Sequence, residues 1–179
     1  MKYKKILIAI IIIGTLILSA CSANMSFSKS IADAELLANS APNPNYKSFI
    51  KIKTEPVKIV KERCSKIGNL VFDEVQLLFR FENITDKPLD FDVQVFINSD
   101  FSNKFTESGN ERIVPNSSPI QLLPGKGFTC ETAFTVRNYN SLSESEKLEF
   151  EKLKNTYIFE FEIDKKFYSV RANLDELAH

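Results

Sequence analysis

Few residues of this sequence could carry out chemistry. Its single histidine, His179, is the last residue of the chain. A histidine-based zinc or copper site, or a triad with histidine as its base, is therefore not expected. A serine or threonine nucleophile with a lysine base stays formally open, but no G-x-S-x-G pattern is present. We therefore predict no catalytic residue, no metal site and no cofactor.

Cysteine is the other residue type with reactive potential. Cys64 follows a predicted strand, and Cys130 lies on the apolar face of another. In an exported protein these two thiols are candidates for a disulfide, which would stabilise the fold by roughly 3–4 kcal/mol. The alternative is two separate thiols, with Cys130 a small core residue. No C-x-x-C pattern indicates a redox-active pair.

Acidic side chains gather near one predicted turn, at Asp86, Asp90 and Asp92. A calcium loop needs carboxylates at alternate positions followed by a glycine, and that pattern is missing. Asp90 and Asp92 instead alternate with apolar residues, as on the solvent face of a strand.

An N-terminal leader indicates where the protein works. Lysines precede an aliphatic run from Ile6 to Leu18, as in a secretory signal peptide. The run is short for a membrane-spanning helix, which needs about 20 apolar residues. Its end reads L-S-A-C up to Cys21 and resembles the lipobox of bacterial lipoproteins. A plain signal peptide or an uncleaved anchor is the alternative.

The lipobox resemblance implies a processed, lipidated protein. Residues 1–20 would be removed as signal peptide, and Cys21 would carry lipid such as palmitate. Two or three acyl chains would then hold the protein stably at the extracytoplasmic face of the cell membrane, since each buried methylene adds roughly 0.8 kcal/mol. The leader holds three of the 23 basic residues and none of the 23 acidic ones. The remaining chain is slightly acidic, so no nucleic-acid partner is expected.

Residues 21–47 are expected to be the lipidated N-terminus and a flexible tether. They are rich in serine, asparagine and alanine, and residues 41–45 read A-P-N-P-N. Ile31 to Ala38 could form two turns of helix, which would be marginal alone in water.

From residue 48 onward, apolar side chains recur at every second position, the period of a β-strand. Fifteen phenylalanines and no tryptophan suit strand cores. The clearest strands are 70–83, 91–97, 128–136, 157–163 and 167–172. The first two are expected to pair as a hairpin across the turn-forming residues 83–88. A further short strand is expected near Glu111 to Val114.

One segment, Ser143 to Lys154, has the pattern of a helix. Ser143 with Glu146, or Ser141 with Glu144, supplies a capping box. The helix is expected to cover one open end of the sheet pair. Its buried side should include Leu142, Leu148 and Leu153, helped by Phe150 or Tyr157.

Short strands with one-sided alternation predict an all-β fold, an antiparallel β-sandwich with one short inserted helix, over residues 48–179. Residues 79–88, FRFENITDKP, resemble the strand–turn–strand signature of immunoglobulin-like domains in small Gram-positive lipoproteins. Residues 123–126, LPGK, resemble the turn before a later strand of the same family. The resemblance covers about Val57 to Asn173 and implies an immunoglobulin-like domain. Family members are largely of unknown function and are usually taken for extracellular binding or accessory modules.

The expected function is that of a non-catalytic binding or accessory module for a protein or a cell-envelope component. Loops carry function on a rigid sandwich, so the polar segment Asp100 to Ser118 is the candidate partner-binding loop. Phe101, Phe105 and Arg112 are its expected contact residues. The alternatives are a structural subunit of an envelope complex, joined through a sheet edge or the helix, and an enzyme that acts on the cell wall.

Overall fold

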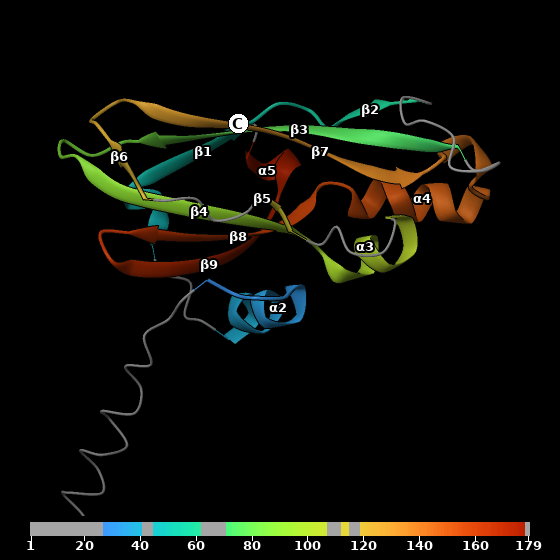
Figure 1. Ribbon diagram of the computed structural model, residues 1–179, viewed down its shortest axis with the longest axis horizontal. Helices are drawn as coiled ribbons and strands as arrows, with labels where there is room; N and C mark the ends of the chain where they lie inside the picture. The colour runs from blue at the N-terminus through green and yellow to red at the C-terminus, as the bar shows by residue number, and fades with distance from the viewer. Residues whose placement is uncertain (1–26, 41–44, 62–70, 107–111, 115–118, 178–179) are drawn as a thin grey trace, which may run out of the picture.

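Two antiparallel β-sheets stack face to face in this protein (Figure 1). The structure is a computed structural model that describes residues 27–40, 45–61, 71–106, 112–114 and 119–177. The predicted β-sandwich is confirmed. Several short helices accompany the sheets, where the sequence had predicted one.

The first sheet is built around β3 (Phe72–Asn83), its longest strand. β7 (Gly127–Arg137) pairs along one edge of β3. The other edge is shared by β1 (Ile50–Thr54) and β2 (Lys58–Val60). These two strands are interrupted at Pro56, because proline has no N–H to donate to a sheet.

The second sheet has β4 (Leu89–Ile97) and β8 (Thr156–Ile163) at its centre. β9 (Lys166–Asn173) pairs with the far edge of β8 through a tight turn. The free side of β4 is shared by β5 (Arg112–Val114) and β6 (Ile120–Leu122). The predicted short strand near residues 111–114 is thus confirmed as β5.

The predicted hairpin of β3 and β4 is wrong, because these strands belong to different sheets. Asn83, buried at the end of β3, donates its side-chain amide to the carbonyl oxygens of Lys87 at 2.7 Å and Leu122 at 2.9 Å. Its backbone N–H donates to the carbonyl of Lys126 at 2.9 Å. These bonds fix the chain as it crosses between the sheets. The alternation of apolar residues is the same in a hairpin and in such a crossover, because in both cases the apolar side chains of the two strands face one core.

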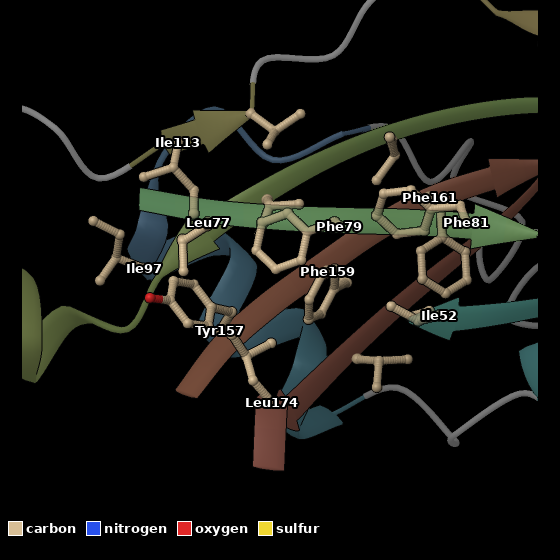
Figure 2. Close-up of a cluster of buried hydrophobic side chains, with 14 of the residues drawn as sticks. Ile52, Leu77, Phe79, Phe81, Ile97, Ile113, Tyr157, Phe159, Phe161 and Leu174 are labelled. Carbon is tan, nitrogen blue, oxygen red and sulfur yellow. The ribbon is translucent and has the colours of Figure 1, made fainter. Parts of the chain in front are cut away.

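Alternate side chains of the long strands meet in a core rich in phenylalanine. Phe79 is fully buried, and its ring centroid lies 5.3 Å from that of Phe159, edge to face. Figure 2 shows Leu77, Phe79 and Phe81 of β3 together with Tyr157, Phe159 and Phe161 of β8. The predicted inward faces of β3, β4 and β8 are confirmed, but the expected solvent position of Asp92 is wrong, because this residue is buried.

Short helices lie between and beside the strands. They are α2 (Ile31–Ser40), α3 (Ser99–Phe105), α4 (Glu144–Leu153) and α5 (Leu174–Leu177), with single 3-10 turns η1 (Tyr46–Ser48) and η2 (Tyr139–Ser141). The capping box of Ser143 and Glu146 is present at the start of α4. The predicted burial of Leu148 is wrong: this side chain is 75% exposed, and Phe150 is the buried anchor of the helix.

The N-terminal segment departs most from expectation. Ile31 and Ala34 of α2 are buried against Phe96 and Ile158, which point outward from the second sheet. The expected flexible tether is therefore wrong for residues 27–40, and also for residues 45–47, because Tyr46 is buried in the main core. The outer faces of β4 and β8 carry apolar side chains that the helix covers, and Figure 1 shows α2 lying below this sheet. The tether residues 21–26 and 41–44 lie outside the described residues.

Candidate functional site

Phe101 and Phe105, the expected partner contacts, belong to the hydrophobic core. Both side chains are fully buried, and their ring centroids lie 5.0 and 5.2 Å from that of Phe150 on α4. The segment forms α3 because the side chain of Asn98 accepts a hydrogen bond from the backbone N–H of Phe101 at 2.9 Å. The prediction that these two phenylalanines contact a partner is wrong, since the sandwich closes its open end with them.

Arg112 is exposed, but its guanidinium is engaged within the chain. It donates to the carbonyl oxygens of Ser28 at 2.9 Å and Lys29 at 3.0 Å. The same group lies 5.3 Å from the ring centroid of Phe96. Arg112 therefore holds the N-terminal segment against the sheet. The remaining candidate loop residues, 107–111 and 115–118, lie outside the described residues.

The cysteine predictions are tested only in part. Cys130 lies half-buried on β7 opposite Phe79, and in the described part of the chain its thiol is free. Burial, helped by the charge of Glu131, raises the pKa of this thiol, so it is a poor nucleophile. Cys64 and Cys21 lie outside the described residues, and both the disulfide and the lipidation stay predictions.

A buried polar row crosses the outer face of the second sheet, and the sequence analysis missed it. Gln94, Glu160 and Ser169 lie side by side on β4, β8 and β9 and are all buried. The carboxylate of Glu160 accepts hydrogen bonds from the backbone N–H of Ser28 at 2.8 Å and from the Gln94 amide at 2.6 Å. The row therefore secures the N-terminal segment.

The same segment is also held by Glu35, in the middle of α2. The Glu35 carboxylate accepts hydrogen bonds from the backbone N–H of Ser99 at 3.0 Å and from its hydroxyl at 2.8 Å. Carboxylates thus hold the docked segment at two points, Ser28 and Glu35. The only sequence signal was on the same outward faces, where Gln94 is followed two positions later by Phe96 and Glu160 is preceded by Ile158.

A groove of about 410 Å³ crosses the outer face of the first sheet. It lies where Pro56 interrupts the edge between β1 and β2. Its lining comes from β2, β3, β7 and the link between β1 and β2: Glu55, Pro56, Lys58, Gln76, Leu77, Leu78, Glu131, Thr132 and Ala133. These residues are called the sheet groove below. Its volume falls within the range of about 300–1,000 Å³ that ligand sites occupy.

The sheet groove combines an apolar floor with a charged rim. Leu78 lies opposite Glu131 in register, so outward side chains of both strands meet there. Glu55, Lys58 and Glu131 are exposed, and none of the three forms an ion pair with another described residue. Such a surface can bind a chain that brings one apolar side chain and a cationic group. Leu78, an apolar residue on the polar face of β3, was the sequence signal for it.

Two features are absent from the described residues. These residues contain no cluster of three or more histidine, cysteine or acidic side chains that could hold a metal ion. Among them, too, no helix has both the length and the apolar character that crossing a membrane requires.

Comparisons with known proteins add little. No protein-family profile matches this sequence, and no curated protein sequence matches it. The fold is similar to a FixG-related protein from Vibrio parahaemolyticus, at 11% identity and a TM-score of 0.25, over 69% of this chain and 92% of the other. It is also similar to an uncharacterized β-sandwich protein from Clostridium difficile, at 7% identity and a TM-score of 0.25, over 70% and 86%. A protein from Archaeoglobus fulgidus matches at 10% identity and a TM-score of 0.22, over 67% and 94%.

Proposed function

We propose that this protein is a lipid-anchored, extracytoplasmic binding module whose sheet groove takes a segment of a protein partner. Anchoring is supported by the leader, with its lysines, its aliphatic run and the L-S-A-C ending at Cys21. Binding is supported by the sheet groove, and this surface is the single observation that carries the proposal.

The sandwich is proposed to be immunoglobulin-like. One sheet runs β1/β2–β3–β7, and the other runs β5/β6–β4–β8–β9. In immunoglobulin lettering, the first sheet then has strands A (β1/β2), B (β3) and E (β7). The second has C′ (β5/β6), C (β4), F (β8) and G (β9), which agrees with the division of strands in such domains. The motifs at 79–88 and 123–126 supply the turns of this topology, as the resemblance to small Gram-positive lipoproteins implies. Such sandwiches serve many functions, so the fold alone selects none.

Binding accounts for the groove better than catalysis does. A catalytic site brings a nucleophile, a base and an oxyanion donor together around one reacting atom. The titratable groups of the sheet groove are Glu55, Lys58 and Glu131, all exposed on its rim. Solvated charges of this kind set partner choice and association rate more than they drive chemistry.

The chemistry of the rim indicates the kind of partner. Two carboxylates and one ammonium give it a negative excess, so a partner segment with a lysine or arginine side chain fits best. Leu78 offers that segment an apolar contact. A partner strand could also add hydrogen bonds, because an extended peptide binds readily beside a sheet.

The test compares two substitutions on the same outward face of β7. Ala133→Tyr fills the sheet groove, whereas Thr129→Tyr changes an exposed residue of the same strand outside it. Tyrosine suits a strand, so both variants should fold. The proteins are cross-linked in intact cells, purified, and their partners identified by mass spectrometry.

We expect one reproducible protein partner for the unaltered chain and for Thr129→Tyr, and its loss for Ala133→Tyr. A partner that survives both substitutions would contradict binding at the groove and favour a structural subunit that uses another surface. Absence of any cross-linked protein would contradict the protein-partner proposal itself.

A further inference from the structure

Three turns gather at the end of the sandwich opposite α3 and α4, at the left of Figure 1. They join β3 to β4 (84–88), β6 to β7 (123–126) and β8 to β9 (164–165), and are called the turn end below. The ring of Phe27, the first described residue, lies edge-on to that of Phe167, with 5.6 Å between centroids. Phe167 stands next to the residue that begins β9. The described part of the chain therefore begins at the turn end.

This position of Phe27 limits how far the turn end can lie from the lipid. Cys21 precedes Phe27 by only six positions. An extended chain spans at most about 3.3–3.6 Å per residue, so these residues reach about 20 Å. If Cys21 carries lipid, as the proposed function holds, Phe27 stays within that distance of the membrane surface. The segment 27–40 does not lengthen the connection between Cys21 and the sandwich, because it is bound to the second sheet.

Apolar side chains project from the turn end. Ile84 is 49% exposed and Leu123 is 50% exposed. Their turns are joined through Asn83, whose carbonyl accepts a hydrogen bond from the backbone N–H of Gly125 at 3.0 Å. Gly125 has a φ of 67°, which glycine adopts without strain. The two apolar tips therefore stand on neighbouring, mutually supported turns.

Positive charge surrounds these tips. The backbone N–H of Ile84 donates to the carbonyl of Phe49 at 3.0 Å, which brings the segment that contains Lys47 to the turn end. Exposed lysines at this end are Lys47, Lys51, Lys87, Lys126, Lys165 and Lys166, and the exposed carboxylates are Asp86, Asp90, Asp164 and Glu176, which lines a hollow together with Ile84 and Lys47. Lysines thus outnumber carboxylates here, although the chain as a whole has equal numbers of acidic and basic residues.

We propose that the turn end is a second contact with the bilayer that holds Cys21. Ile84 and Leu123 enter the headgroup region, and the surrounding lysines bind anionic headgroups. The sandwich then stands with α3 and α4 away from the membrane, and the sheet groove faces sideways, where a partner can reach it. An apolar tip ringed by lysines suits this interface, since apolar burial and attraction to anionic lipid add together.

The test uses the absence of tryptophan from the chain. Leu123→Trp places a single indole at the turn end, and Leu148→Trp places one on the exposed face of α4 as the matched control. Each full-length lipidated protein is reconstituted into vesicles of phosphatidylcholine, with or without phosphatidylglycerol, that contain brominated acyl chains. Flotation reports attachment, and indole quenching with a blue shift reports contact with the bilayer.

In anionic vesicles we expect quenching and a blue shift for Leu123→Trp and neither for Leu148→Trp. Each lysine near an anionic surface contributes about a five-fold factor to binding. Adding Lys87→Gln and Lys126→Gln should therefore weaken docking about 25-fold and reduce the quenching while flotation persists.

Flotation without quenching at position 123, or equal quenching at both positions, would overturn the proposed orientation and leave the lipid anchor intact. Failure of the unaltered protein to float would instead overturn the anchor, and with it the inference that rests on it.

Discussion

Replacing Phe101 by alanine should destabilise the protein severely and reveal the phenylalanine as core. Its side chain is fully buried, with ring centroids of Phe105 at 5.2 Å, Phe134 at 6.2 Å and Phe150 at 5.0 Å. Truncation of a buried phenylalanine costs about 3–5 kcal/mol, because the removed ring leaves a cavity. A domain of this kind is stable by about 5–15 kcal/mol, so the variant should fold only marginally.

The assay is urea unfolding of the processed chain with Cys21→Ser, followed by circular dichroism. With a urea dependence of about 2 kcal/mol per M, the midpoint should fall by about 2 M. Leu148→Ala is the control, because this side chain is 75% exposed and its loss should change stability by less than about 0.5 kcal/mol. A loss below about 1 kcal/mol for Phe101→Ala, together with lost partner binding, would refute the core assignment.

Three further predictions concern the docked segment, the start of α4 and the thiol. Glu160→Gln should disturb the hydrogen bonds that Ser28 donates to this side chain and speed hydrogen exchange at the Ser28 amide roughly 10- to 100-fold. Glu162→Gln changes a half-exposed residue of the same strand and should leave this exchange rate unchanged. Equal exchange rates in the two variants would contradict docking of the segment. Hydrogen bonds from the backbone N–H and hydroxyl of Ser143 lower the pKa of Glu146 from 4.5 to about 2. This carboxylate therefore stabilises the fold above about pH 4.5 and loses its effect as the pH falls toward 2. Glu146→Gln should flatten the dependence of Tm on pH between these two values. An unchanged dependence of Tm on pH would count against the cap. Cys130 should resist alkylation in the native protein, and it should react once the protein is unfolded, with no reductant present. If the unfolded protein is alkylated at Cys130 only after a reductant is added, the disulfide to Cys64 is present instead.

Local signals in the sequence predicted the strands and α4 well. Period-two alternation found β3, β4, β7, β8 and β9, because each of these strands buries one face in the same core. The capping box at Ser143 located the start of α4. Both signals depend only on neighbouring residues, and the tertiary structure does not override them.

Features that depend on distant residues could not be predicted in this way. α2 has a weakly apolar face and is held by Phe96 and Ile158, more than 50 positions away. α3 was hidden in a polar stretch, because only Phe101 and Phe105, four positions apart, reach the core. The order of the strands in the two sheets determines both the crossover from β3 to β4 and the position of the sheet groove. The alternation of apolar residues along one strand carries no information about this order.

Membrane anchoring and contact of the turn end with the bilayer both depend on the lipid proposed on Cys21. The most direct measurement is the intact mass of the protein extracted from membranes with detergent, with its N-terminal peptide analysed by tandem mass spectrometry. We predict a chain that begins at Cys21 and carries a diacylglyceryl group, with or without a third acyl chain. A chain that retains the leader, or an unmodified thiol at Cys21, would contradict the account.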